Sequence, residues 1–431
     1  MFLIVGISSR AVVESAVQAG FNVLALDYYG DWDSRQQGPV LGLKSDLGLM
    51  PSVKNLLALA RSITLVPGGP AIDTCDNPFE GMVYTSGPDN HPEGLGFWER
   101  RGLLAGNPPS ALKGVRDPWL LRKALAQINV AMPPFTRADR RLMPATGRQW
   151  LLKPLASGGG HGIRLLSREP VKARSQLTAL QDKEGFIIQQ FIPGIPCSAT
   201  FLADGRRAVL LGASRQLVGA GEPGARPFVY AGNIVPLVLP FRPGMQVLER
   251  LLNRIAGHLT ATFGLKGLNT IDFIANSRGI WVLEVNPRWS ASVELIEKKL
   301  NLPLFAWHIA ACGFGNAINP ELIFSGGGVG NDRGRPACRP TVQYDFWGKA
   351  IVYAQKTFTV APLIGPGLLY RQGMRDIPLP GTLVSAGQPV CTVIVRAASE
   401  NSCRQQLGSR AAWARRILGE GDGDCRTSVA Y

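Results

Sequence analysis

The segment from Gly267 to Arg288, which reads GLNTIDFIANSRGIWVLEVNPR, limits what this chain can fold into more than any other stretch. Residues of high β-propensity flank an Asn-Ser-Arg-Gly turn that begins at Asn276, and this pattern predicts a β-hairpin. If the connection is a three-residue loop that ends at the glycine, Asn276 pairs with Ile280. That register places Asp272 directly opposite Glu284, so two carboxylates would lie side by side on one ribbon.

The predicted hairpin carries further polar side chains on the same face. Side chains alternate along a strand, so Asn286 and Arg288 share the face of Asp272 and Glu284. Two carboxylates and an amide form an all-oxygen site that suits Mg²⁺, and a fixed guanidinium beside them suits a phosphate. We therefore predict a magnesium site at Asp272, Glu284 and Asn286. The alternative is a surface hairpin whose charged side chains only face water.

The composition is that of a globular protein with an ample core. The chain has 431 residues, 45% hydrophobic and 18% charged, and such a length suggests roughly two to four domains. No apolar run approaches the roughly 18 residues needed to span a bilayer, and the first residues read as a strand and not as a signal peptide. Seven scattered cysteines without a CxxC motif, and only four histidines, argue against disulfides and zinc. We expect a cytoplasmic protein with no membrane partner.

The net charge is strongly positive, with 46 Lys and Arg against 31 Asp and Glu, which gives +15. Such a charge could serve nucleic acid or another polyanion. However, the excess is mostly arginine spread along the chain, and no long basic run stands out. Anionic small substrates or plain compositional bias explain the charge equally well, so nucleic acid is not the expected partner.

Residues 1–106 are predicted to form an open α/β domain. A strand, a helix and a second strand within residues 2–27 form the βαβ-type opening of a parallel sheet. The G-x-G-x-x-G fingerprint of a dinucleotide site is missing, because only Gly6 precedes the helix. A later β run, 81–86, ends in a loop at the edge where open α/β sheets hold ligands. The loop residues Asp89 to His91 could bind substrate there, although a loop histidine without function is the commoner case.

Residues 107–312 are predicted to form an α+β block, with helices at 118–127 and 246–262. A long loop at 219–233, rich in Gly, Pro and aromatic residues, is of a kind that is often functional. The rest of the chain divides into a linker at 313–340, a small β-rich domain at 341–400 and a basic tail at 401–431, which we expect to be partly disordered.

A lysine followed by glycines is the second motif with chemical meaning. Lys153 lies near the end of an expected strand and is followed by Gly158, Gly159, Gly160 and Gly162. A glycine backbone can approach a phosphate closely, and its successive N–H groups form an anion-binding concavity. The motif is not a P-loop, because the lysine precedes the glycines and no GK[ST] follows. The alternative is a flexible turn, and we assign no catalytic role to His161.

A third motif is the strand at 186–192, which ends in a Pro-Gly turn. The backbone of such a strand could pair with the edge of an adenine, while Phe191 or Ile192 packs on the face of the ring. An ordinary strand and turn is an equally good interpretation of these residues taken alone. The candidate nucleotide-binding residues here are Gln189, Gln190, Phe191 and Ile192.

The order of these motifs resembles the ATP-grasp superfamily, and the resemblance covers most of the chain. It implies an open α/β domain followed by a two-subdomain ATP-grasp fold that holds ATP with Mg²⁺, or with Mn²⁺ as a second candidate. By motif, Lys153 and the glycines of 158–162 look like the residues that contact the ATP phosphates. Arg116 lies where the family often has a further phosphate-binding lysine. Residues 189–192 match the adenine-binding strand, and Arg288 matches the residue that stabilises the transferring phosphate.

The resemblance assigns the metal to the same hairpin residues, Asp272, Glu284 and Asn286. Two positions depart from the family pattern. Gln189 stands where an acidic residue commonly meets the adenine amino group, and Pro196 stands where a ribose-binding acid is common. These departures concern the nucleotide base and the ribose, and they do not touch the phosphate chemistry.

Residues 376–390 look like the small β domain that closes carboxylase-like ATP-grasp proteins. The Met-Lys-Met turn of a biotin carrier is absent, so covalent biotin is not expected. A packing role without chemistry is the preferred interpretation of this region.

The resemblance implies an ADP-forming carboxylate-amine ligase with Lys153 and Arg288 as its catalytic residues. In that chemistry a substrate carboxylate attacks the γ-phosphate of ATP, and an amine or similar nucleophile traps the acyl phosphate. The product would be a small amide, with cofactor biosynthesis as one expected setting. A bicarbonate-using carboxylase and a non-catalytic regulator that binds ATP or a polyanion are the alternatives. The acceptor is not encoded, and a homodimer is expected only because related folds often form one.

Overall fold

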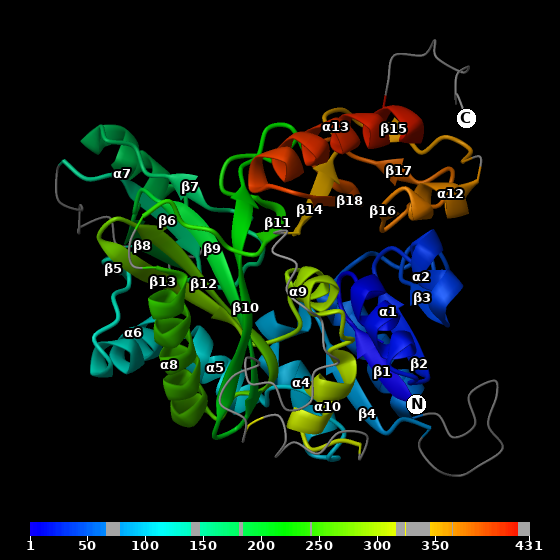
Figure 1. Cartoon of the computed structure of the whole chain (residues 1–431), viewed down its shortest axis with the longest axis horizontal. Helices are drawn as coiled ribbons and strands as arrows, with labels where there is room; N and C mark the ends of the chain where they lie inside the picture. Colours follow the sequence, from blue (N-terminus) through cyan, green and yellow to red (C-terminus); the bar gives the residue numbers. More distant parts are fainter. Residues whose placement is uncertain are drawn as a thin grey trace.

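The computed structural model describes residues 1–65, 78–138, 147–180, 184–241, 244–315, 324, 345–363 and 365–420. Three sheets organise these residues: a parallel sheet at the N-terminus, a small antiparallel sheet and an eight-stranded antiparallel sheet, with a two-stranded ribbon beside them. In the view of Figure 1 the N-terminal sheet and the small sheet lie on opposite sides of the long central strands β9, β10, β12 and β13. This arrangement leaves the central strands with neighbours on both sides.

The N-terminal sheet contains β1 (Phe2–Val5), β2 (Val23–Asp27), β3 (Val40–Gly42) and β4 (Gly81–Tyr84), paired in parallel in the order β3-β2-β1-β4. Every residue of β1 and β4 is buried, which explains why both strands read as continuous hydrophobic runs. The predicted open α/β fold of this region is confirmed. Its helices are α1 (Arg10–Gln18), α2 (Trp32–Gln37), α3 (Val53–Leu65), η1 (Pro88–Asn90) and α4 (Pro92–Glu99).

The small sheet contains β5 (Phe135–Arg137), β6 (Trp150–Pro154), β7 (Arg164–Leu165) and β8 (Phe186–Gln190), in the order β5-β8-β6-β7. Helix α7 (Pro170–Thr178) covers it, and Leu152, Leu177 and Ile188 belong to the separate small core between them. Helices α5 (Pro109–Arg116) and α6 (Pro118–Gln127) precede this sheet in the chain. Asp117 caps α6 by accepting hydrogen bonds from the N–H groups of Trp119 and Leu120.

The eight-stranded sheet has the order β13-β12-β9-β10-β11-β14-β18-β16. Helix α8 (Met245–Phe263) packs on β9 and β10 through residues at helical spacing, including Leu248, Leu252, Ile255 and Leu259. Gly264 ends this helix in the left-handed conformation, with φ of 67°. The long strands are β9 (Ile195–Asp204), β10 (Ala208–Val218), β11 (Tyr230–Val235), β12 (Lys266–Asn276) and β13 (Gly279–Asn286).

Helices α9 (Val293–Leu300) and α10 (Phe305–Ala311) join the large sheet to the N-terminal domain. Helix α9 packs on β11 and β14, whereas α10 packs on β9, β12 and α1. The ring of Phe2 in β1 meets the ring of Phe305 edge-on, with centroids 5.5 Å apart. One hydrophobic core therefore spans both regions, which fixes the N-terminal sheet relative to the hairpin β12–β13.

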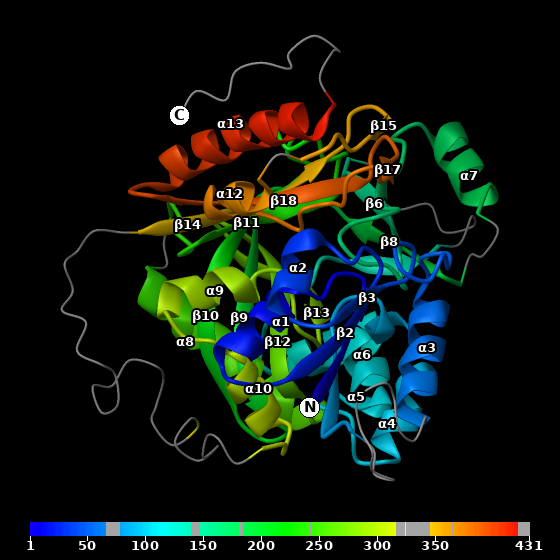
Figure 2. The ribbon, with the colours of Figure 1, turned by 90° about the vertical axis from the view of Figure 1, so that its right-hand side faces the viewer.

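Apart from the two-stranded ribbon of β15 (Phe358–Thr359) and β17 (Leu383–Val384), the C-terminal strands belong to the large sheet. β14 (Phe346–Tyr353) pairs with β11, and β18 (Pro389–Ala397) pairs with β14, so the predicted small β-rich domain continues the eight-stranded sheet. Figure 2 shows these strands beneath α13. The remaining elements here are α12 (Pro366–Arg371), β16 (Met374–Arg375) and α13 (Glu400–Leu418).

The prediction of a partly disordered tail from residue 401 is wrong as far as the end of α13. Cys403, Leu407, Ala411, Ala414 and Leu418 recur at helical spacing and bury one face of this helix, which packs on β14 and β18. The many arginines masked this stripe in the sequence. Residues 421–431, and most of the linker predicted at 313–340, lie outside the described residues. Within the described part of the chain, we find no helix that is both long enough and apolar enough to cross a membrane.

Candidate active site

The hairpin β12–β13 has the predicted carboxylate pair but a different turn. Asn276 pairs with Gly279, and not with Ile280, so the connection is a two-residue loop. A β-bulge between Asp272 and Phe273 then restores the predicted register, and Asp272 lies opposite Glu284. The shorter turn alone would move the pairing by one residue. The extra residue at the bulge moves it back, so the side chains beyond the bulge pair as predicted. The prediction for the pair is confirmed, although the three-residue loop behind it is wrong.

Two amide side chains hold the carboxylate of Asp272 from opposite sides. Asn286 Nδ2 donates to Asp272 Oδ2 at 2.9 Å, and Gln216 Nε2 on β10 donates to Asp272 Oδ1 at 2.9 Å. The predicted metal ligands Asp272, Glu284 and Asn286 therefore lie together. Gln216 was not predicted, although the alternation of Ser214 and Gln216 along β10 is a signal for a polar face.

The two carboxylates of the pair titrate differently. Burial and the nearby Glu284 raise the pKa of Asp272 to about 7. Burial would also raise the pKa of Glu284, but the ammonium group of Lys153 lowers it below the usual value. Lys153 Nζ lies 2.6 Å from Glu284 Oε2, and the Glu284 side chain is 41% exposed at the cleft, so the ion pair with Lys153 controls its titration.

The chemistry of these side chains fits a divalent cation. Two carboxylates and the amide oxygen of Asn286 are hard oxygen donors of the kind that Mg²⁺ prefers, and the repulsion that raises the pKa of Asp272 would be relieved by a cation. Over the described residues there is no group of three or more His, Cys, Asp or Glu side chains placed to hold a metal. A metal here would therefore take its remaining ligands from water or from phosphate oxygens.

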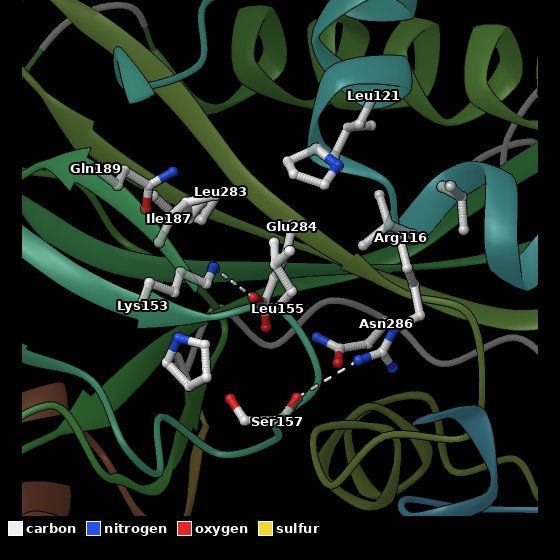
Figure 3. Close-up of a pocket in the computed structure, with 14 residues that line it drawn as sticks. Arg116, Leu121, Lys153, Leu155, Ser157, Ile187, Gln189, Leu283, Glu284 and Asn286 are labelled. Atoms are coloured by element: carbon white, nitrogen blue, oxygen red, sulfur yellow. Dashed lines mark hydrogen bonds and ion pairs between the residues drawn. The ribbon is translucent and has the colours of Figure 1, made fainter. Parts of the chain in front are cut away.

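Lys153 lies in a cleft between the small sheet and the hairpin. Figure 3 shows its ammonium group directed at Glu284, with Gln189 on the neighbouring strand and Asn286 and Arg116 on the far side. The same cleft has an apolar part lined by Val115, Leu121, Ile187 and Leu283. A cleft lined by both charged and apolar side chains suits a nucleotide, whose phosphates are charged and whose base is flat and largely apolar.

The glycine loop after β6 needs its glycines for two reasons. Gly159, Gly160 and Gly162 have φ of 61°, 76° and 81°, a region that side-chain-bearing residues rarely adopt, whereas Gly158 is not among the residues with positive φ. A Cβ on Gly160 would also lie 1.9 Å from the carbonyl oxygen of Phe228. The N–H of Tyr230 donates to the carbonyl of Gly159 at 2.9 Å. The loop therefore rests against the start of β11, and the predicted 219–233 loop ends there, at Tyr230.

The strand predicted to meet adenine is β8, the inner strand next to β5 and β6. The N–H of Gln190 donates to Pro134 and the N–H of Phe191 donates to Gln149, at 2.8 and 2.9 Å. Because both N–H groups already have partners within the chain, any hydrogen bonds to an adenine edge would have to come from other groups of this segment. Gln189 is buried and borders the cleft, while the ring of Phe191 is 37% exposed. The structure leaves Ile192 next to Phe191, just beyond the end of β8.

Both predicted arginines meet at one carboxylate from the N-terminal domain. Asp89 Oδ2 accepts from Arg116 Nη1 and, at 3.1 Å, from Arg288 Nε. Asp89 lies in η1, just beyond β4, and was predicted only as part of a substrate loop. The neighbouring His91 is exposed. The loop thus contributes an anchor for arginines, which the sequence did not reveal because the partners lie 27 and 199 residues away.

Comparison with known proteins supports the fold. Residues 115–292 match the family model described as an ATP-grasp domain. The large chain of carbamoyl phosphate synthase from Thermus thermophilus is 25% identical over 240 residues, which are 52% of this chain and 22% of that protein. The chain therefore spans about a fifth of the length of that relative. An uncharacterized protein of Methanocaldococcus jannaschii is 21% identical over 91% of this chain and 88% of its own length.

Solved structures share the fold over nearly the whole chain. The biotin carboxylase domain of the Hydrogenobacter thermophilus 2-oxoglutarate carboxylase has a TM-score of 0.66 at 14% identity, covering 94% of this chain and 88% of that one. The L-amino acid ligase of Bacillus licheniformis has a TM-score of 0.62 at 15% identity, covering 97% of both chains. Residues 115–292 therefore match the ATP-grasp domain family, and the chain shares the fold of these carboxylase and ligase structures over nearly its whole length.

Proposed function

We propose that this protein is an ADP-forming ligase that activates a small-molecule carboxylate with ATP and joins it to an amine. The observation that carries the proposal is the carboxylate pair Asp272 and Glu284, which lies beside Lys153 in the cleft. This arrangement matches the needs of phosphoryl transfer, in which positioning and charge neutralisation supply most of the catalysis. The proposal covers small-molecule biosynthesis, with a cofactor precursor as one class of product.

The residues would divide the work as follows. Lys153 and the N–H groups of the glycine loop would hold the ATP phosphates, and Arg116 would hold them from α5. Asp272, Glu284 and Asn286 would hold Mg²⁺, or Mn²⁺ in its place, which supplies Lewis-acid neutralisation of the phosphate oxygens. Arg288 would stabilise the phosphoryl group in transit.

The reaction balances without a protein nucleophile. An oxygen of the substrate carboxylate bonds to the γ-phosphorus, and the bond from that phosphorus to the β–γ bridging oxygen breaks, releasing ADP. The amine nitrogen then bonds to the acyl carbon, the bond from that carbon to the phosphate oxygen breaks, and the amine proton goes to water. Lys153 and Arg288 act by fixed positive charge, so neither has to exchange a proton during the cycle.

A bicarbonate-using carboxylase is the second candidate. Similarity to biotin carboxylase domains over 94% of the chain favours it, and the structure of one such domain contains MgADP and bicarbonate. The L-amino acid ligase covers the chain equally well, so fold alone does not choose between the two chemistries. A regulator that binds ATP without turnover is the third candidate, in which case magnesium and ATP would bind but no acceptor would release ADP.

The deciding experiment is ADP release screened against amino acids, other carboxylates with amines, and bicarbonate, with mass spectrometry of the products. The ligase proposal expects ADP release that needs both a carboxylate and an amine. The product should have the summed mass of the carboxylic acid and the amine less one water. ADP release with bicarbonate alone would instead support the carboxylase. An Asp272→Asn variant serves as the inactive control. A homodimer and a cytoplasmic location stay predictions, which gel filtration and cell fractionation would test.

A further inference from the structure

Asp89 lies in the short helix η1 at the carboxyl end of β4, and it is almost fully buried, at 2% exposure. Its oxygen Oδ1 accepts a hydrogen bond from the N–H of Gly87 at 2.9 Å. Its oxygen Oδ2 accepts from Arg116 and from Arg288. One carboxylate, fixed on its own turn, therefore receives two guanidinium groups from opposite ends of the ATP-grasp domain.

Each of these arginines continues to a different part of the cleft. Arg116 Nη2 donates to Asn90 Oδ1 and, at 3.4 Å, to the carbonyl of Ser157, which begins the glycine loop. The dashed line from Arg116 to Ser157 in Figure 3 marks this second contact. Through Arg116, Asp89 is therefore connected to the segment proposed to cover the ATP phosphates.

Through Arg288, Asp89 is connected to the candidate metal site. Arg288 Nη2 donates to Asn286 Oδ1 at 3.2 Å, and Asn286 in turn donates to Asp272. Arg288 Nη1 donates to the carbonyl of Trp289 at 3.2 Å, which adds a backbone anchor. Asp89 is therefore linked by one to three successive hydrogen bonds to four side chains assigned to the phosphate and metal sites, which are Arg116, Arg288, Asn286 and Asp272.

The charge balance of this cluster favours an incoming anion. Asp89 compensates one unit of charge while Arg116 and Arg288 bring two, and the Arg288 side chain is 10% exposed. Two guanidiniums so close would repel each other without the carboxylate between them. Asp89 therefore brings both guanidinium groups close together and compensates only one of their two charges.

We propose that Asp89 is a positioning residue through which the N-terminal domain sets the orientation of Arg116 and Arg288 for phosphoryl transfer. This inference rests on the proposed function for the meaning of the two arginines. It makes the N-terminal sheet part of the phosphate site, although Asp89 itself touches neither substrate nor metal. Without this carboxylate both arginines would still be present and charged, but their guanidinium groups would be free to move apart.

The test compares Asp89→Asn with Asp117→Asn. Both remove one negative charge near Arg116, but Asp117 is the N-cap of α6 and contacts neither guanidinium, and Asn caps a helix as well as Asp does. For Asp89→Asn we expect kcat to fall about 10- to 100-fold, as for other groups that orient a catalytic residue. The affinity for a magnesium complex of a non-hydrolysable ATP analogue should stay equal or rise, because a negative charge has left the phosphate site. Asp117→Asn should change both quantities less than about twofold.

This split separates positioning from damage to the fold, which would weaken binding and turnover together. Wild-type kcat in Asp89→Asn, or a parallel loss in both variants, would overturn the proposal. Asp89→Glu restores the charge with a longer side chain, and full recovery of kcat in that variant would show that charge matters and position does not. If Asp89→Asn does not fold, a double-mutant cycle of Arg116→Lys and Arg288→Lys replaces it. Strictly additive effects on kcat would then contradict a shared anchor.

A readout without turnover keeps this inference separate from the proposed function. Amide hydrogen exchange of residues 156–162 should quicken in Asp89→Asn, because Arg116 loses its anchor and with it the contact to Ser157. Asp117→Asn should leave that exchange unchanged. Unchanged exchange in Asp89→Asn would contradict the anchor directly. If the wild-type protein releases no ADP with any acceptor, the proposed function fails, and the exchange experiment still decides on Asp89.

Discussion

Two clusters of arginines and carboxylates, one at the domain junction and one around Asp89, have opposite charge balance. At the domain junction, Arg10 on α1 is 1% exposed and donates to both oxygens of Glu294, at 2.7 and 2.8 Å. Asp376 and Glu14 also accept from Arg10, and Lys349 pairs with Glu294 at 2.6 Å. In the cleft, two arginines share the single carboxylate of Asp89. Among these side chains, carboxylates outnumber cations at the junction, whereas around Asp89 the two guanidinium groups outnumber the one carboxylate.

The difference shows which arginines are committed to the fold. Burial alone would lower the pKa of Arg10, yet the carboxylates of Asp376, Glu294 and Glu14 raise it well above its usual value. Burial would raise the pKa of Glu294, yet Arg10 and Lys349 lower it well below its usual range. The charged groups of Arg10 and Lys349 already have acceptors from the chain, so this cluster holds domains together. Around Asp89 one of the two guanidinium charges is not compensated by that carboxylate, which suits a ligand that carries phosphate or carboxylate.

The largest effect should come from breaking the junction with Arg10→Met. This change removes a side chain that contacts Glu294, Asp376 and Glu14 together, and breaking a buried pair costs about 3–5 kcal/mol because charges are left uncompensated. Chemical denaturation would measure the loss. Arg404→Met is the matched control, because its partner Glu400 is one turn away on α13 and the Arg404 side chain is 38% exposed, so less than about 1 kcal/mol should be lost. Equal losses would remove the contrast between the two clusters.

The next effect concerns the cleft, where Glu284→Gln should act on turnover and not on stability. Removing this carboxylate deletes a proposed metal ligand and the partner of Lys153, so kcat should fall more than about a hundredfold. Because the side chain is 41% exposed, the free energy of unfolding should change by less than about 1 kcal/mol. ADP release and denaturation measured on the same preparation would test both halves. A variant with normal turnover would remove Glu284 from the metal site.

A third prediction uses pH to probe the packing behind the cleft. Burial lowers the pKa of His308 to about 4, and its Nδ1 accepts from the N–H of Leu268 while Nε2 donates to the carbonyl of Ala105. The folded state therefore binds fewer protons than the unfolded state between about pH 4 and 6.5. Stability from this residue is complete above pH 6.5 and is lost as the pH falls to 4, a change on the order of 3 kcal/mol.

The check is the pH dependence of the unfolding free energy in wild type and in His308→Gln, which cannot titrate. The variant should be less stable overall but should lose less stability between pH 6.5 and 4. The difference between the two proteins is needed because Asp33 and Glu297, whose pKa values are raised to about 7, act in the opposite direction in this range. Parallel curves would show that His308 does not stay neutral in the folded protein.

The smallest effect should come from Gln190→Ala, at the rim of the cleft. The side chain of Gln190 accepts one hydrogen bond, from the exposed Arg148 at 2.9 Å, and such a bond contributes about 1 kcal/mol or less. Affinity for ATP should change less than about threefold, because the Gln190 side chain is engaged by Arg148 and alanine keeps the backbone hydrogen bond to Pro134. Calorimetry with the ATP analogue would measure it. A large loss of affinity would instead indicate that the Gln190 side chain contacts the nucleotide.

Local patterns predicted the parts of the site that depend on neighbours in the chain. The hairpin follows from β-propensity and a polar turn, and the carboxylate pair was predicted correctly, although the turn was wrong and the bulge was not predicted. The glycine loop follows from the need for positive φ at Gly159, Gly160 and Gly162. The tail failed because arginines on the exposed face of α13 concealed the buried stripe of Leu407 and Leu418. The engaged N–H groups of β8 were missed because Pro134 and Gln149 belong to other segments.

The sequence by itself determined the superfamily resemblance, the lysine–glycine loop and the carboxylates of the hairpin, because each depends on residues close together in the chain. Only the tertiary structure decided which charges are available. Asp89 meets Arg288 across 199 residues, Gln216 meets Asp272 across 56, and Arg10 meets Glu294 across 284. A charged side chain reads the same in sequence whether its partner is water, another residue or a ligand. Burial and distance in the folded chain separate these cases, since they set the free energy of each charge.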